Sequence, residues 1–279
     1  MVNCFVIGDM GKGTDDQYRV AKMMKRLYKQ LQIQFVMGLG DNMYPNGCTS
    51  VKDKRFYDNF EKVYEELPDD RWYMCLGNHD YGYQLDSTDS THKFVDNSRV
   101  QIEYTNHSKK WYMPSSYYSF VKGPVEFFYL DTNFDRLSES SIAEQLKVMK
   151  NKLDNCNQRF KVIVGHHTWR SIAGHGNAEP RLETFLGDLF RDTKPHMYMG
   201  GHDHCKSIMV KDGITILTSG NGGERYESPD VHMTNMTDCR LDYFSPSLGV
   251  ASLKIHPTSL HVSFYNDKGF KEYQHVIKA

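Results

Sequence analysis

Short apolar runs alternate with amphipathic segments over the first two thirds of the chain. Each run is followed by glycine and then polar residues, which predicts buried strands over residues 4–7, 33–37, 72–76, 160–164 and 196–199. Between these runs, apolar residues recur at helical spacing, which predicts helices over residues 20–31, 55–66, 142–153 and 181–190. Strands that alternate with helices in this way are typical of an α/β fold.

The middle of the chain contains one stretch without clear periodicity. Residues 82–113 are largely polar and predict a long surface excursion whose aromatic end returns to the body of the protein. Two further strands are predicted over residues 117–121 and 125–130, joined across Gly123-Pro124.

The last third of the chain changes to short β segments. Residues 207–210 and 214–218 flank Asp212-Gly213, which is a hairpin signal, and a second pair of strands is predicted near the C-terminus. Alternating β and α elements followed by antiparallel strands fit two sheets packed face to face with helices outside. We therefore predict an α/β (α+β) fold in which residues 1–279 form a single domain, because no linker divides the chain.

Composition and charge restrict the classes of function. The net charge of -1 and the pI of about 6.9 argue against a dedicated nucleic-acid-binding protein. No run of 18 apolar residues and no signal-peptide pattern occurs, so we expect an intracellular protein without a membrane span. The six cysteines include no CxxC pair, and reduced thiols are expected.

Five predicted strands are followed by side chains that can bind metals, namely Asp9, Asp41, Asn78, His166, His202 and His204. In open α/β sheets the carboxyl ends of the strands line one crevice, so residues far apart in sequence can converge there. Oxygen donors favour Fe(III) or Mn, whereas imidazole suits Zn, Fe(II) or Mn(II). This mixture fits two cations about 3.5–4 Å apart that share a carboxylate.

Each of these residues also has an ordinary structural interpretation. An isolated Asp after a strand can cap a helix, Tyr44 can pack in the core, and a pair such as His202 and His204 can lie on the surface. Because side chains alternate along an extended segment, only one of His166 and His167 can face the crevice. We expect His166 to do so, with His167 packed or hydrogen-bonded beside it.

Taken together, these segments resemble the five ordered sequence blocks of the calcineurin-like metallophosphoesterases. The matching blocks are Gly8-Asp9-Met10-Gly11, Gly40-Asp41-Asn42-Met43-Tyr44, Gly77-Asn78-His79-Asp80, Val164-Gly165-His166 and Gly201-His202-Asp203-His204. Tyr44 and the segment 171–176 resemble the purple acid phosphatases in particular, of the small, mammalian-like, tartrate-resistant type. The resemblance covers nearly the whole chain and implies a four-layer αββα sandwich, the metallophosphoesterase fold.

The resemblance also implies a binuclear metal centre in which Asp41 bridges the two ions. The implied ligands are Asp9, Asp41, Tyr44 and His204 for Fe(III), and Asp41, Asn78, His166 and His202 for a divalent Fe, Zn or Mn. His79 and His175 would lie outside the metal ligands, hold the phosphate and supply a proton to the leaving group. With Asn78 they form the predicted catalytic set.

Two neighbouring residues receive less specific predictions. Asp80 is expected to orient His79, and Arg170, on the rim of the site, is expected to be an exposed charge.

The implied activity is that of an acid phosphatase, in which a metal-bound hydroxide attacks a phosphomonoester in line without a phosphoenzyme. The expected substrate is a small phosphomonoester or a phosphoprotein, with no nucleic-acid or membrane partner and with a monomer favoured. One alternative is a phosphodiesterase or phosphoprotein phosphatase of the wider superfamily, although such relatives generally lack the Tyr44 phenolate. Another is a catalytically inactive, metal-stabilised binding protein, against which the complete ligand set argues.

Overall fold

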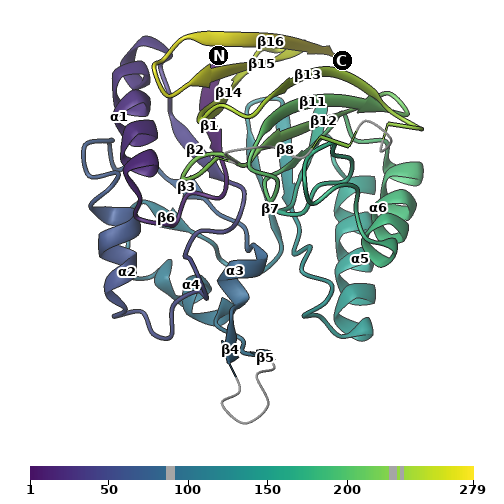
Figure 1. Cartoon of the computed structure of the whole chain (residues 1–279). Coiled ribbons are helices and arrows are strands. Elements are labelled where there is room, and N and C mark those ends of the chain that lie inside the picture. The colour runs from purple at the N-terminus through teal and green to yellow at the C-terminus, as the bar shows by residue number, and fades with distance from the viewer. Residues whose placement is uncertain (86–91, 226–230, 233–235) are drawn as a thin grey trace.

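A computed structural model describes residues 1–85, 92–225, 231–232 and 236–279. The described strands form two seven-stranded sheets and a short hairpin of β4 (Tyr83–Leu85) and β5 (His92–Phe94). The two large sheets lie between helices on either side (Figure 1), as predicted.

The first sheet joins the two ends of the chain. Its order is β16–β15–β14–β1–β2–β3–β6, with parallel pairing from β1 to β6 and antiparallel pairing from β1 to β16. Its strands are β1 (Val2–Ile7), β2 (Phe35–Gly38), β3 (Trp72–Tyr73), β6 (Trp111–Tyr112), β14 (Gly249–Ile255), β15 (Ser259–Asn266) and β16 (Lys271–Lys278).

The second sheet has the order β13–β11–β12–β10–β9–β8–β7, in which β8, β9, β10 and β12 are parallel. Its strands are β7 (Tyr118–Lys122), β8 (Val125–Tyr129), β9 (Phe160–Val164), β10 (Met197–Gly200), β11 (Lys206–Lys211), β12 (Ile214–Ser219) and β13 (Arg240–Ser245). The predicted hairpin is confirmed, because β11 and β12 pair antiparallel across Asp212 and Gly213, both with positive φ.

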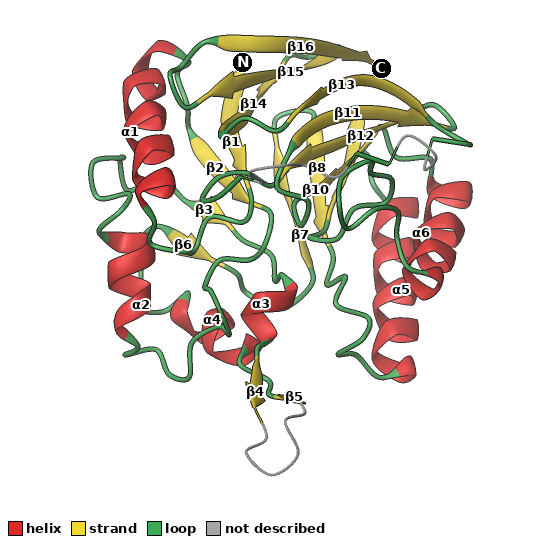
Figure 2. Cartoon of the chain, in the orientation of Figure 1, coloured by secondary structure: helices red, strands yellow, loops and turns green. Residues whose placement is uncertain are grey.

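Helices cover the outer faces of the two sheets (Figure 2). Helix α1 (Asp15–Gln30) lies beside the first sheet, and α5 (Glu139–Asp154) and α6 (Pro180–Thr193) lie beside the second. Side chains cap the start of each helix: Thr14 for α1, Ser138 for α5 and Glu179 for α6. The chain therefore forms the predicted αββα layers.

The alternation of side chains along the second sheet separates two hydrophobic cores. Phe127 and Tyr129 of β8 belong to the large core that they share with the first sheet. Phe128 and Leu130 belong to the smaller core under α5 and α6. A strand covered on both faces must be apolar at every position, which explains the continuous apolar runs in the sequence.

Several sequence-based predictions need correction. The helix expected over 55–66 is a short α2 (Lys54–Phe56) that continues into a π-helical segment (Tyr57–Glu61). The stretch 82–113, whose residues 86–91 lie outside the described part, contains helix α4 (Ser98–Tyr104) as well as β4, β5 and β6. The pattern did not predict β13 or β16.

Two predictions from composition can also be compared with the structure. All six cysteines are free thiols. Among the described helices, none has the length and apolar character needed to cross a bilayer.

Candidate metal centre

The strand ends deliver the candidate ligands through unusual backbone turns. Asp9 follows β1, Asp41 follows β2 and His202 follows β10, and their φ angles are 56°, 51° and 69°. Residues other than glycine rarely adopt positive φ, and clusters of such residues are typical of functional sites. These turns bring the side chains of separate strands together at one edge of the paired sheets.

One group of oxygen and nitrogen atoms gathers around the Tyr44 hydroxyl. This hydroxyl lies 3.0 Å from Asp41 Oδ2, 3.4 Å from Asp9 Oδ1 and 3.4 Å from His204 Nε2. His204 Nε2 is also 3.6 Å from Asp9 Oδ1. All four side chains are buried, so these atoms face one another with little solvent between them.

A second group gathers around His166 Nε2. This atom lies 3.0 Å from Asn78 Oδ1, 3.2 Å from His202 Nδ1 and 3.5 Å from Asp41 Oδ1. Asp41 therefore presents one carboxylate oxygen to each group. Asp9, Asp41 and His166 alone already place three ligand atoms within 4.8 Å of one another.

The tautomer of His166 follows from its other nitrogen. His166 Nδ1 lies 2.8 Å from the carbonyl oxygen of Leu39, to which it donates, so in the neutral ring Nε2 carries a lone pair. That lone pair faces the oxygens of Asn78 and Asp41, which are also acceptors. Acceptors that converge in a buried place require a cation, either a proton or a metal ion.

Glycines leave the space that this arrangement occupies. A Cβ atom at Gly77 would lie 2.2 Å from Asp41 Oδ1, and one at Gly201 would lie 2.5 Å from Asp9 Oδ2. The sequence motifs thus contain glycine where the backbone must approach the candidate ligands closely.

The electrostatics of the centre favour bound positive charge. Burial raises the pKa of Asp9 well above its usual range, and the neighbouring Asp41 adds to this effect. Burial would lower the pKa of His166, but the attraction of Asp41 outweighs it and raises this pKa to about 10. The ionised Asp41 thus draws a proton onto His166, where a metal ion could provide the charge instead.

The other two imidazoles are held neutral. Burial lowers the pKa of His204 to about 4 and that of His202 well below its ordinary value. Burial, together with Asp41 and Asp9, raises the pKa of Tyr44 well above its usual range. Neutral imidazoles are the form that binds metals, whereas Tyr44 would need a strongly charged ion beside it to become a phenolate.

His79 and His175 flank these two groups. His79 Nδ1 donates to the carbonyl oxygen of Pro45 at 2.7 Å, which leaves Nε2 4.0 Å from Asp41 Oδ2. The His175 ring stacks on His202 with centroids 4.0 Å apart. A pocket of about 360 Å³ adjoins them, with His175, His202 and Asn78 in its wall.

The structure changes the interpretation of Asp80. Its carboxylate accepts hydrogen bonds from the backbone N–H groups of Asn42, Met43 and Gly77 and from the Gln101 side chain. Asp80 therefore fastens the loop after β2 to the loop after β3, rather than orienting the His79 ring.

The expectation for Arg170 is wrong, and that for His167 is confirmed only in part. Arg170 is only 6% exposed and forms ion pairs with Glu183 and Asp238, so its role is structural. His167 is hydrogen-bonded as expected, with Nδ1 2.9 Å from the Thr132 hydroxyl, but its ring also lines the pocket beside the metal centre, 4.5 Å from the His202 ring.

Sequence reasoning missed two carboxylates that support the site. Glu224 Oε2 lies 3.5 Å from His204 Nδ1, on the far side of the ring from Tyr44, and Glu224 also pairs with Lys12. Asp203 Oδ1 accepts the backbone N–H of His175 at 2.9 Å. Asp203 lies within the motif Gly201-His202-Asp203-His204 and could have been identified from the sequence, whereas Glu224 follows a glycine-rich loop and belongs to no motif.

Comparisons with known proteins agree with this geometry. A family profile described as Calcineurin-like phosphoesterase matches residues 3–206. The chain is 29% identical to Purple acid phosphatase 4 of Arabidopsis thaliana, over 96% of this chain and 81% of that protein. It is 30% identical to tartrate-resistant acid phosphatase type 5 of Rattus norvegicus, over 77% of this chain and 71% of that protein.

The fold is also found among solved structures. The chain superimposes with a TM-score of 0.83 on a protein described as GAP50, the anchor in the inner membrane complex of Plasmodium. The match covers 99% of this chain and 88% of that one at 19% identity, so it establishes the fold alone. The family profile spans most of the sequence of this chain. The chain therefore belongs to the calcineurin-like phosphoesterase family, with purple acid phosphatases among its relatives.

Proposed function

We propose that the protein is a binuclear-metal acid phosphatase that hydrolyses phosphomonoesters. The observation that carries this proposal is the position of Asp41, whose two carboxylate oxygens face two separate groups of ligand atoms. The relatives of this chain that are named purple acid phosphatase and tartrate-resistant acid phosphatase support the choice of activity.

The two groups would hold different metals because their donors differ. The group around Tyr44 offers two carboxylates, a phenol and an imidazole, a set that suits Fe(III). The group around His166 offers two imidazoles, an amide oxygen and a carboxylate, a set that suits divalent Fe, Zn or Mn. When bound, the pair would neutralise phosphate oxygens and acidify water at the site.

The residues around the metal ligands would position the substrate. His79 lies beside Asp41 and His175 beside His202, and both can donate protons to phosphate oxygens or to the leaving alkoxide. The adjoining pocket of about 360 Å³ leaves room for the group esterified to phosphate. Asp203 fixes the backbone of His175, and Asp80 fixes the loop that carries Asp41.

A comparison of two chromogenic substrates tests the proposal. Protein reconstituted with iron and with iron plus zinc is assayed on p-nitrophenyl phosphate and on bis(p-nitrophenyl) phosphate, with metal content measured in the same samples. The monoester should be hydrolysed faster at acidic pH. Faster hydrolysis of the diester would favour the phosphodiesterase alternative, and two bound metals without hydrolysis would indicate the inactive binding protein.

A further inference from the structure

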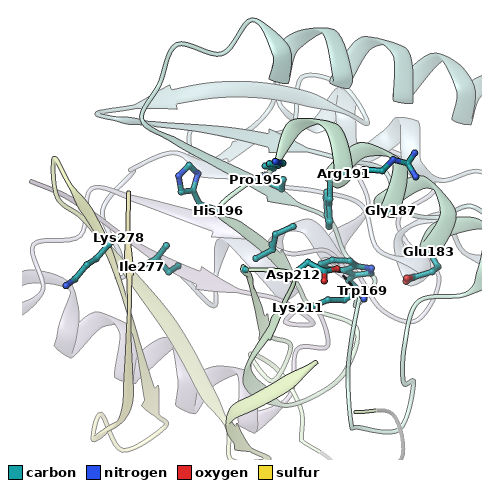
Figure 3. A pocket seen from close by; sticks show the side chains of 14 residues that line it. Trp169, Glu183, Gly187, Arg191, Pro195, His196, Lys211, Asp212, Ile277 and Lys278 are labelled. Carbon is teal, nitrogen blue, oxygen red and sulfur yellow. Dashed lines mark ion pairs between the residues drawn. The ribbon is translucent and has the colours of Figure 1, made fainter. Parts of the chain in front are cut away.

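A second cavity lies away from the metal centre. Its volume is about 730 Å³, which is within the range of pockets that hold small organic ligands. It is bounded by the C-terminal end of α6, the β11–β12 hairpin and the end of β16 (Figure 3).

This cavity lies at the opposite end of β10 from the metal ligands. Pro195 and His196, which immediately precede β10, line the cavity, whereas His202 follows that strand. The four residues of β10 span roughly 13 Å at about 3.3 Å per residue. The cavity is therefore separate from the pocket beside the metal centre.

Part of the wall is apolar and rigid. Trp169 and Phe190 meet edge to face, with ring centroids 4.7 Å apart, and both line the cavity. Ile214 and Ile277 add aliphatic surface from the hairpin and from β16. Such a wall suits a flat or aliphatic body.

Two rings of this wall carry N–H groups. Trp169 is 2% exposed, and its Nε1 has no hydrogen-bond partner among the described residues. His196 Nδ1 accepts the backbone N–H of Lys161 at 3.2 Å, so its Nε2 carries the proton when the ring is neutral. Because the Trp169 Nε1 atom is itself buried, this ring presents its apolar surface to the cavity and not its N–H group.

The charged side chains of the wall differ in whether they form ion pairs. Lys194 and Lys278 line the cavity and form no ion pair with any described residue. The acidic members are already engaged, Glu183 with Arg170 and Asp212 with Lys211. Lys194 and Lys278 are thus the charged residues of the wall that lack an ion-pair partner among the described residues.

The backbone of Lys194 adds a further observation. Lys194 ends α6 with φ of 44°, a left-handed conformation that usually takes glycine. A cation near a helix C-terminus also offsets the helix dipole, which is an ordinary role for Lys194. That role does not account for Lys278, which comes from β16 and also lines the cavity.

We propose that this cavity is a binding site for a small organic anion, with an aromatic or aliphatic body and one carboxylate, sulfonate or phosphate. The body would contact Phe190, Ile214 and Ile277, and the anion would accept hydrogen bonds from Lys194 and Lys278. The assignment does not depend on metal binding or on phosphatase activity.

Calorimetric titration with three probes tests the ligand class. 2-Naphthalenesulfonate should bind to the full-length protein with saturable 1:1 stoichiometry, and its affinity should fall as salt is raised. The neutral isostere 2-naphthalenemethanol and inorganic sulfate should each bind at least about tenfold more weakly, since each lacks one half of the recognition. Equal binding of the alcohol would overturn the requirement for an anion.

Paired lysine variants locate the site. Lys194→Ala/Lys278→Ala should weaken 2-naphthalenesulfonate binding about tenfold. The control Lys52→Ala/Lys147→Ala removes the same charge from exposed positions outside the cavity and should leave the affinity unchanged. Equal affinities in the two double variants, both with the thermal unfolding of the parent, would contradict the proposal.

A single ring replacement provides a second readout that does not alter charge. Trp169→Phe retains an aromatic ring but reduces the aromatic surface of the wall, so it should weaken 2-naphthalenesulfonate binding by a few-fold. Unchanged affinity in this variant would show that Trp169 does not contact the ligand and would overturn its part in the site.

Discussion

The polar groups near the two ends of strand β10 differ in the kind of partner that they lack. At the carboxyl end, Asp41, Asn78 and His166 turn acceptor atoms towards one another. At the amino end, Lys194 and Lys278 line a cavity and form no ion pair with any described residue. Buried acceptors without partners are costly, so the carboxyl end calls for a cation, whereas the unpaired ammonium groups at the amino end favour an anion.

The largest effect should come from removing the carboxylate that both metal groups share. Asp41→Asn replaces one charged oxygen with an amide and should lower phosphatase activity by about 10³-fold or more, with loss of both metals. Activity and metal content are measured together, with Asp212→Asn in the exposed hairpin as the matched control. Retention of two metals by Asp41→Asn would show that this residue does not bridge them.

His175 should act at the acceptor end without holding a metal. His175→Ala removes a ring that stacks on His202, and turnover should fall about 10²-fold while metal content stays at the wild-type value. Steady-state kinetics and metal analysis of the same preparation separate the two effects. Lower metal content would instead make His175 a ligand or a support of one.

Glu224 should contribute a smaller effect through His204. A carboxylate beside the outer nitrogen of a metal-binding imidazole fixes the ring and strengthens it as a ligand. Glu224→Gln should therefore weaken iron binding about tenfold, as measured by competition with a chelator. Unchanged iron affinity would show that Lys12 and Glu224 form only a surface pair.

The smallest predicted effect concerns the ion pair of Arg170 and Asp238 and depends on pH. The hydrogen bond from Arg170 holds the pKa of Asp238 below its ordinary value, so this pair stabilises the fold above that value and loses its effect as acid protonates Asp238. Asp238 is largely exposed, and solvent screening limits the contribution to about 1 kcal/mol. Denaturant unfolding of Asp238→Asn should show this deficit at pH 7, and the deficit should shrink towards pH 3. A deficit that is the same at both pH values would contradict the ion-pair explanation.

The sequence predicted the elements and the candidate site residues that local patterns encode. Asp9 and Asp41 could be identified because each follows a buried strand and glycine, and the topology of parallel strands then brings them to one edge. Strand β16 could not be predicted, because it is an edge strand that mixes charged and apolar residues.

The supporting contacts could not be predicted because they join segments that are distant in sequence. Asp80 meets Gln101, which belongs to a helix within the stretch expected to be irregular. Arg170 is buried only because Glu183 and Asp238 approach it from elsewhere in the chain. The anion cavity likewise combines α6, the β11–β12 hairpin and β16, and no local motif marks it.

Metal analysis combined with a visible absorption spectrum of the iron-loaded protein tests the central claim most directly. We expect two metal ions per chain and a purple or pink colour from charge transfer between the Tyr44 phenolate and Fe(III), and the colour should disappear in Tyr44→Phe. A colourless protein that is fully active with only manganese or zinc would contradict the ferric assignment, and a single metal ion per chain would contradict the binuclear centre.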